Sequence, residues 1–455
     1  MTAPILIWLR RDLRLADHPA LAAAAAEGPV VLAFCLDEQG GRPFGGASRW
    51  WLHQSLAQLG GVTLALGRSE QEIPRLALAC GARAVYWNQS ADPVLRTVED
   101  RVQAALTVPC RIFPGDTLFA PGSVRSKSGG QFQVFTAFWR AALALPPPAR
   151  PLPAPAALHV APCPGLELNA LGLMPKLEWW RSMASAWRPG EAGATTLLGA
   201  FLDGPVQAYH RQRDRPDHDA TSRLSPHLAF GEISPRQIWH AAQAVPPDDG
   251  VRTFLKELGW REFSRHLLAN HPTLPQVPLR REFAAFPWRD DPAALRQWQM
   301  GRTGYPIVDA GMRQLWATGW MHNRVRMVVA SFLIKDLLIP WQAGEEWFWD
   351  TLVDADSASN AASWQWVAGS GADAAPFFRI FNPVTQGEKF DPDGSYVRNW
   401  VPELAHLSTA VIHQPWKLGR VPGYPPPMID HAAARTRALA AFKGLRGAPE
   451  QPRFL

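Results

Sequence analysis

One stretch of the sequence combines residue types that rarely share a helical face in a protein core. Glu257, Trp260 and Arg261 are spaced at i, i+3 and i+4, so a helix would bring them to one face. That face carries a carboxylate, a broad aromatic surface and a guanidinium. The mixture is unlike a core stripe and marks a candidate binding face.

A second stretch, from Trp320 to Met327, shows a similar mixture. Helical spacing places Asn323, Arg326 and Met327 on one face, while valines fill other faces. An exposed polar face of an ordinary helix is the alternative interpretation. The presence of Trp320 and Met327 argues against it.

In a third stretch, residues 354–366, small side chains separate two acids, an amide and two indoles. These residues are Asp354, Asp356, Asn360, Trp364 and Trp366. Small spacers of this kind allow a planar ligand to approach closely. Either acid could pair with Arg326 or accept a hydrogen bond from a sugar hydroxyl, although read alone the stretch is a loop-to-helix junction.

The chain of 455 residues is long enough for two or more cores, and its 47% hydrophobic and 19% charged residues are ordinary for a globular protein. No apolar run approaches the ~20 residues of a membrane-spanning helix. The apolar N-terminal run is followed, not preceded, by Arg10 and Arg11, so we expect no secretory signal.

Charge and composition indicate which classes of binding partner the protein has. The net charge of +6 favours a polyanion, and the basic residues are mostly Arg, which suits phosphate. The 4 cysteines form no metal-binding pattern and are expected to be reduced thiols, and the 13 histidines include no HExxH motif. Hydrolytic metal chemistry therefore has little support.

Residues 1–130 alternate short apolar runs with Ala-rich helical stretches. Strands are expected at 5–9, 30–36, 62–66, 84–87 and 110–113, and helices near 20–27, 49–59, 71–80 and 93–106. This alternation predicts an α/β domain built on a doubly wound parallel sheet.

The chain changes character after residue 130. Eight prolines between Pro146 and Pro164 argue against helices and sheet ladders, so residues 131–195 are expected to form a Pro-rich linker. From 196 to 455 the apolar residues recur with helical spacing, as in Phe254, Leu258 and Phe263. These residues are expected to form a mostly α-helical domain.

Several motifs, in a fixed order along the chain, resemble the photolyase/cryptochrome family. They are Trp8 to Leu21, Thr221 to Ser225, Gly319 to Met327, Trp364 to Trp366, and Phe378 to Pro392. The branch that they resemble most is the class I cyclobutane pyrimidine dimer photolyases of bacteria, also called deoxyribodipyrimidine photolyases.

The resemblance implies that the helical domain binds FAD. The residues expected to bind this cofactor are Tyr209, Arg213, Thr221, Ser222, Leu224, Ser225, Arg261, Asn323, Arg326, Asp354, Asp356 and Asn360. Hydroxyl and backbone donors of residues 221–225 would hold the pyrophosphate, and Arg326 would pair with Asp354. The amide oxygen of Asn360 would accept from flavin N5–H; plant-type cryptochromes carry Asp there, so Asn favours repair over signalling.

The resemblance also assigns residues to the DNA lesion. Those expected to bind it are Glu257, Trp260, Asn323, Arg324, Met327 and Trp366. Trp260 and Trp366 would wall a pyrimidine dimer flipped out of the duplex, and Glu257 would act as a catalytic hydrogen-bond partner. Three further indoles, Trp364, Trp341 and Trp288, would relay electrons from the surface to an oxidised flavin.

The implied activity is light-driven repair of cyclobutane pyrimidine dimers by electron transfer from excited FADH⁻, the reaction of a deoxyribodipyrimidine photo-lyase. A blue-light cryptochrome that signals through a partner protein is the alternative. A (6-4) photolyase would read its lesion with a His pair, but here Asn323 follows His322. We expect a cytoplasmic, nucleoid-associated bacterial monomer that binds damaged DNA, with no membrane and no obligate protein partner.

The α/β domain of this family holds an antenna chromophore, most often a reduced folate. Folate-binding members place an amide and an acid where this chain has Asp92-Pro-Val-Leu95, and Pro93, Val94 and Leu95 cannot supply those bonds. A deazaflavin, a flavin, a reduced folate held differently and no antenna at all remain open.

Overall fold

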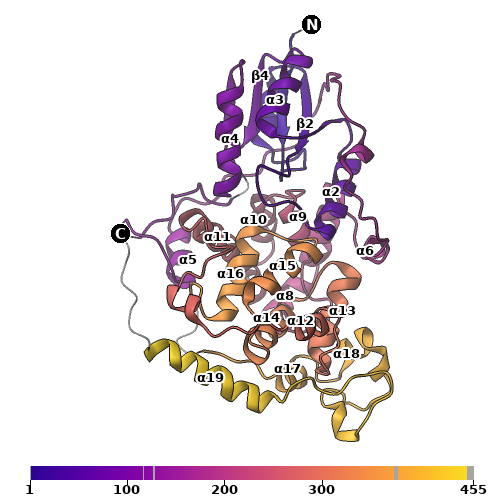
Figure 1. The fold of residues 1–455 in the computed structure, drawn as a ribbon. Helices are drawn as coiled ribbons and strands as arrows, with labels where there is room; N and C mark the ends of the chain where they lie inside the picture. Colours follow the sequence, from indigo (N-terminus) through magenta and orange to yellow (C-terminus); the bar gives the residue numbers. More distant parts are fainter. Residues whose placement is uncertain (1, 116, 127–128, 374–377, 448–455) are drawn as a thin grey trace. The chain divides into compact units, whose positions relative to one another are not determined.

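The computed structural model describes residues 2–115, 117–126, 129–373 and 378–447. The first part alternates strands and helices (Figure 1). These elements are β1 (Ile5–Leu9), α1 (Pro19–Glu27), β2 (Val30–Leu36), α2 (Gly46–Leu59), β3 (Val62–Leu66), α3 (Ser69–Ala79), β4 (Ala84–Asn88), α4 (Pro93–Ala105) and β5 (Cys110–Phe113). The strands form one parallel sheet in the order β3-β2-β1-β4-β5, which confirms the predicted doubly wound α/β fold.

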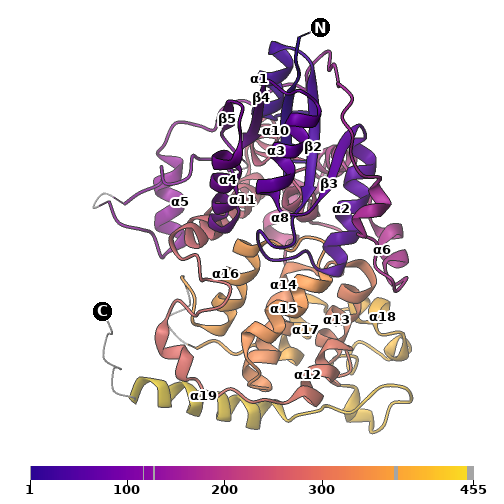
Figure 2. The ribbon, with the colours of Figure 1, turned by 45° about the horizontal axis from the view of Figure 1, so that its top comes forward.

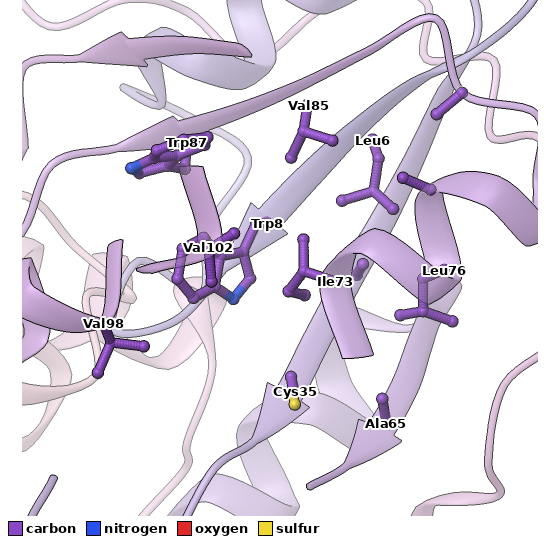
Figure 3. Close-up of a cluster of buried hydrophobic side chains, with 13 residues drawn as sticks. Leu6, Trp8, Cys35, Ala65, Ile73, Leu76, Val85, Trp87, Val98 and Val102 are labelled. Carbon is purple, nitrogen blue, oxygen red and sulfur yellow. The ribbon is translucent and has the colours of Figure 1, made fainter. Parts of the chain in front are cut away.

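Helices α3 and α4 cover one face of the sheet (Figure 3). The buried side chains of this core are Leu6, Trp8, Ala33, Cys35, Ala65, Ile73, Leu76, Ala77, Ala82, Val85, Trp87, Val98 and Val102. The rings of Trp8 and Trp87 meet edge to face, with centroids 5.7 Å apart. Every residue of β1 and β2 is buried, which explains why these strands are continuous apolar runs and not alternating ones.

The Pro-rich segment 146–164 forms no helix, but it does pair with the sheet. Val160 forms a parallel bridge with Val30 at the start of β2. The Val30 N–H donates to the carbonyl of His159, and the Ala161 N–H donates to the carbonyl of Val30, each at 2.8 Å. This is an isolated bridge and not a sheet ladder, and it forms because the residues between the prolines keep their N–H groups.

In the rest of the described chain the regular elements are helices, and residues 196–447 are mostly helical, as predicted. Its elements are α5 (Phe135–Leu143), η1 (Leu168–Leu171), α6 (Trp180–Ala186), α7 (Glu191–Leu202), α8 (Pro205–Gln212), α9 (Ser225–Ala229), α10 (Pro235–Gln243), α11 (Asp249–Asn270), η2 (Arg281–Ala285), α12 (Pro292–Gln299), α13 (Pro306–Thr318), α14 (Asn323–Ser331), η3 (Phe332–Asp336), α15 (Trp341–Thr351), α16 (Ser357–Ala368), α17 (Pro383–Phe390), α18 (Ser395–Trp400), η4 (Pro402–Leu404), η5 (Pro415–Leu418) and α19 (His431–Gly447). The segment predicted as linker, 131–195, contains α5, η1, α6 and the start of α7.

Internal contacts divide the chain into two compact units. Unit 1 comprises Met1–Arg211, Ala220–Pro272 and Trp349–Ser359, and unit 2 comprises Gln212–Asp219, Thr273–Phe348 and Asn360–Leu455. Unit 1 thus adds helices such as α10 and α11 to the α/β sheet. The domain boundaries at 130 and 195 stay a prediction.

Within unit 1, α5 packs against α11 at Gly259 (Figure 2). A Cβ atom on Gly259 would lie 2.6 Å from Cε3 of Trp139, so only glycine allows this close approach. One residue further, the ring of Trp260 stacks on Phe135 with centroids 3.8 Å apart and planes 9° apart. Helix α5 therefore fixes the position of the indole predicted to contact DNA.

We expect Gly259→Ala to destabilise the protein by about 1–3 kcal/mol, because the added methyl group overlaps Trp139 in a filled contact. Gly199 in the exposed face of α7 is a matched control, since nothing lies within 4 Å of its Cβ position. Gly199→Ala should raise stability by up to about 1 kcal/mol through helix propensity. Urea unfolding measures both; equal shifts for the two variants would contradict this packing.

Candidate functional site

Asn360, in α16, is held by two hydrogen bonds from one amide nitrogen. Its Nδ2 donates to the backbone carbonyl of Glu345 at 3.0 Å and to Oε1 of Glu345 at 2.7 Å. Both side chains are buried. Because a carbonyl only accepts, the amide must present its nitrogen to Glu345. Oδ1 takes part in neither bond and is the acceptor that this side chain can offer to a ligand.

Asp356 is an ionised carboxylate at the start of α16. Its Oδ1 accepts from the Ser359 N–H at 2.8 Å, and its Oδ2 lies 3.4 Å from Nη2 of Arg265. Burial by itself would raise the pKa of Asp356. The positive charge of Arg265 and the Ser359 N–H outweigh this effect, with help from Arg261 and Arg11, and lower the pKa to about 2.

Ser225 and Asp354 meet at the turn that precedes α9. The Ser225 hydroxyl donates to Oδ2 of Asp354 at 2.6 Å. Two residues earlier Arg223 has φ 51°, a left-handed conformation that turns the chain into α9. The guanidinium of Arg223 lies over the ring of Trp187, with Cζ 4.4 Å from the centroid. The turn thus brings its hydroxyl and backbone donors beside a buried acid.

The predicted residues divide between the two units, and each set is described by itself. Unit 1 contains Tyr209, Thr221, Ser222, Leu224, Ser225, Glu257, Trp260, Arg261, Asp354 and Asp356. Unit 2 contains Arg213, Trp288, Asn323, Arg324, Arg326, Met327, Trp341, Asn360, Trp364 and Trp366. The expected ion pair of Arg326 with Asp354 joins residues of different units and stays a prediction.

Helix α15 positions two of the relay indoles in unit 2. Trp341 is its first residue, and a Cβ on Gly344 would lie 2.2 Å from Cη2 of Trp364. Because Gly344 follows Trp341 by three residues, the Trp364 ring rests on the helix face that also presents Trp341. Trp364 and Trp341 are buried, whereas Trp288 is partly exposed, its ring 4.4 Å from that of Phe286.

The α14 residues make local contacts in unit 2. Arg324 forms an ion pair with Asp214 at 2.9 Å, and its Cζ lies 4.5 Å from the ring centroid of Phe390. Arg326 donates from Nε to the carbonyl of Met321 at 2.7 Å. A DNA phosphate at Arg324 would therefore share this guanidinium with Asp214.

Two buried polar residues with positioning roles were not found from the sequence: Glu345, described above, and Gln365. Gln365 donates to the carbonyls of Leu274 at 2.7 Å and Val277 at 2.9 Å, and it accepts from the Leu279 N–H at 2.9 Å. It fastens the 274–279 loop to α16 between the two indoles. The sequence signal that could have identified Gln365 is its position between two tryptophans, Trp364 and Trp366.

The crevice at the carboxyl ends of β1 and β4, where the strand order reverses, is the usual ligand site of such sheets. Here Arg10, just after β1, pairs with Glu99 of α4 and with the carbonyl of Asn88. Asn88 also donates to Asp12 at 2.9 Å, and these acids and the amide are buried.

Residues 5–156 match the family model described as DNA photolyase, and residues 254–444 match the FAD binding domain of DNA photolyase. The chain belongs to the photolyase and cryptochrome family. The expected family and the FAD-binding domain are thereby confirmed.

The relatives of this chain include both photolyases and cryptochromes. The chain is 47% identical to a deoxyribodipyrimidine photo-lyase of Agrobacterium fabrum, over 98% of each chain. It is 40% identical to cryptochrome-1 of Arabidopsis thaliana, over 90% of this chain and 64% of that protein. The crystal structure of a class III photolyase from Agrobacterium tumefaciens, 46% identical, matches with a TM-score of 0.94 over 98% of each chain. This description names class III, whereas the sequence motifs suggested class I.

No helix among the described residues is long and apolar enough to cross a membrane.

His322 precedes α14 and caps it, accepting from the Arg324 N–H through Nδ1 at 3.2 Å. Burial is the main cause that lowers its pKa, and the carboxylate of Asp214 opposes this effect. The guanidinium groups of Arg324, Arg326 and Arg213 add to the lowering, which brings the pKa of His322 from 6.5 to about 4. The imidazole is therefore neutral in the folded protein near neutral pH.

His322 binds a proton at a higher pH in the unfolded chain than in the folded protein. Protonation therefore favours the unfolded chain, and stability should fall as the pH decreases from about 6.5 to about 4. The loss is expected to reach about 2 kcal/mol at pH 5. In His322→Asn, which keeps a capping acceptor but does not titrate, this part of the pH dependence should disappear. Urea unfolding of both proteins across this range is the measurement, and parallel losses would contradict the assignment.

Proposed function

We propose that the protein is a deoxyribodipyrimidine photo-lyase that repairs cyclobutane pyrimidine dimers in DNA under light. The observation that carries this proposal is the orientation of Asn360. Glu345 takes the amide nitrogen, so the oxygen is available to accept from a flavin N5–H. The asparagine favours repair, since plant-type cryptochromes carry aspartate there, and the identity to a named photo-lyase supports the same conclusion.

The side chains that would hold FAD suit its chemistry. When bound and reduced, FAD would supply the electron that opens the dimer in the light and take it back afterwards. The turn at 221–225 would hold the pyrophosphate with hydroxyl and backbone donors. Asp356, kept ionised by Arg265, would accept hydrogen bonds from ribityl hydroxyls. Asn360 would accept from the flavin ring.

The family resemblance assigns the lesion to Glu257, Trp260, Asn323, Met327 and Trp366. Phe135 already stacks on one face of the Trp260 indole, so the other face is the one on which a base can stack. Stacking of a base on an aromatic ring contributes about 1–3 kcal/mol. Arg324 would contact a phosphate.

A blue-light cryptochrome is the second candidate, and the identity of 40% to a plant cryptochrome favours it. It shares the fold and the flavin but needs no pocket for damaged DNA. Activity on a defined lesion separates the two functions.

The test illuminates FAD-loaded, reduced protein with oligonucleotides that carry either a cyclobutane dimer or a (6-4) product. We expect restored thymines from the cyclobutane substrate only, in light and not in darkness. Restoration of neither substrate at any absorbed wavelength would favour the cryptochrome. Restoration of the (6-4) product alone would reassign the lesion.

Trp364→Phe should slow photoreduction of bound, oxidised flavin at least about tenfold, equivalent to about 1.4 kcal/mol on the barrier, because the buried indole beside α15 is the easily oxidised neighbour. Repair by chemically pre-reduced protein should stay nearly intact. Trp87→Phe removes an equally buried indole from the sheet core and is the matched control. Flash absorption measures the rate; unchanged photoreduction in Trp364→Phe would remove the relay assignment.

A further inference from the structure

Two cysteines that are far apart in the sequence meet at the last turn of α3. Cys80 Sγ lies 3.6 Å from the carbonyl oxygen of Ala77, and Cys163 Sγ lies 3.8 Å from the carbonyl oxygen of Leu76. The Cys80 N–H donates to the same Leu76 oxygen at 3.0 Å. The two sulfurs thus approach the carbonyls of adjacent residues in one helix turn, and both cysteines pack against the core of the α/β sheet.

Backbone pairing on both sides of Cys163 holds it there. Before it, the Ala161 N–H donates to Val30 at 2.8 Å, and after it the Leu166 N–H donates to Leu64 at 2.8 Å. Pro162 and Pro164 flank the cysteine and restrict its backbone to extended conformations.

Gly165 adds a further constraint on the backbone of residues 161–166. A Cβ atom there would lie 2.9 Å from the backbone nitrogen of Leu64, so the chain runs directly on the edge of β3. The sulfur of Cys163 is therefore presented to α3 by a fixed segment and not by a loose loop.

The other cysteines of the chain are placed differently. Cys35 is buried in β2, its Sγ 3.4 Å from the carbonyl of Gly67, and Cys110 lies in β5. Cys80, Cys110 and Cys163 are all partly buried, so a small oxidant can reach each of them, but only Cys80 and Cys163 have their sulfurs at the last turn of α3.

We propose that Cys80 and Cys163 form a redox-sensitive pair that a peroxide converts into a disulfide, fastening the Pro-rich segment to α3. One thiolate attacks the peroxide O–O bond and becomes a sulfenic acid, releasing water from hydrogen peroxide. The second sulfur then displaces the sulfenic hydroxyl as water, forming the S–S bond. Two thiols and one hydrogen peroxide thus give one disulfide and two waters.

The pKa of the thiols determines how fast the pair is oxidised. Burial, followed by the neighbouring Cys163 thiol, raises the pKa of Cys80 to about 11. The thiolate is the reactive form, so oxidation should be slow near neutral pH and faster in alkaline solution. The bond would close a long loop that contains β4, α4, β5 and α5, which restricts the unfolded chain.

The test treats full-length, FAD-loaded protein with hydrogen peroxide at mildly alkaline pH, blocks the remaining thiols with iodoacetamide, and maps non-reduced tryptic peptides by mass spectrometry. We expect one cross-linked species joining Cys80 to Cys163, lighter by two hydrogen atoms and reversed by dithiothreitol. Cys35 and Cys110 should remain alkylated. The oxidised protein should unfold at a higher temperature than the reduced protein.

Cys80→Ser and Cys163→Ser should each abolish the cross-link and the rise in unfolding temperature, whereas Cys110→Ser should keep both. If a variant fails to fold, joint loss of Cys80 and Cys163 alkylation in the wild-type protein decides the question. A cross-link to another cysteine, or continued alkylation of both, would overturn the proposal. A cross-link that leaves the unfolding temperature unchanged would overturn the fastening role. The outcome is independent of the repair activity.

Discussion

The pair of hydrogen bonds from the Asn360 amide to Glu345 is the interaction on which the functional account depends. A buried amide can turn either its nitrogen or its oxygen toward a ligand, and here the backbone carbonyl of Glu345 removes that freedom. The same helix, α15, provides Trp341 and the glycine against which Trp364 rests. The packing of α15 against α16 thus determines which atom of Asn360 can accept a hydrogen bond from a flavin. It also fixes the position of the Trp364 ring.

Buried charge is the second constraint. Asp356 stays ionised because guanidinium groups outweigh the cost of burial, and the Asp12 carboxylate, whose pKa is likewise lowered despite burial, lies beside His18 and Arg10 at the end of β1. Guanidinium groups suit this task because they remain charged and donate in fixed directions. The predominance of Arg over Lys in the composition therefore reflects interior ion pairs as well as any attraction to DNA.

The sequence predicted the sheet strands to within a residue because parallel strands buried on both faces are continuous apolar runs bounded by helices. It could not show that Val160 pairs with Val30, or that Gln365 fastens a distant loop, because each depends on partners far away in the chain. The motif residues were found by type and spacing. Glu345 was missed because its neighbours in sequence are ordinary and only its contact with Asn360 gives it a role. The approach of Cys163 to the last turn of α3, beside Cys80, was hidden for the same reason.

A crystal structure of the FAD-loaded protein, bound to DNA with a cyclobutane dimer, tests the central claim most directly. The account predicts that Asn360 keeps its nitrogen on Glu345 and places Oδ1 within hydrogen-bonding distance of flavin N5, with the dimer flipped onto the face of Trp260 opposite Phe135. A flavin bound away from Asn360, or an amide that turns its nitrogen toward N5, would contradict it.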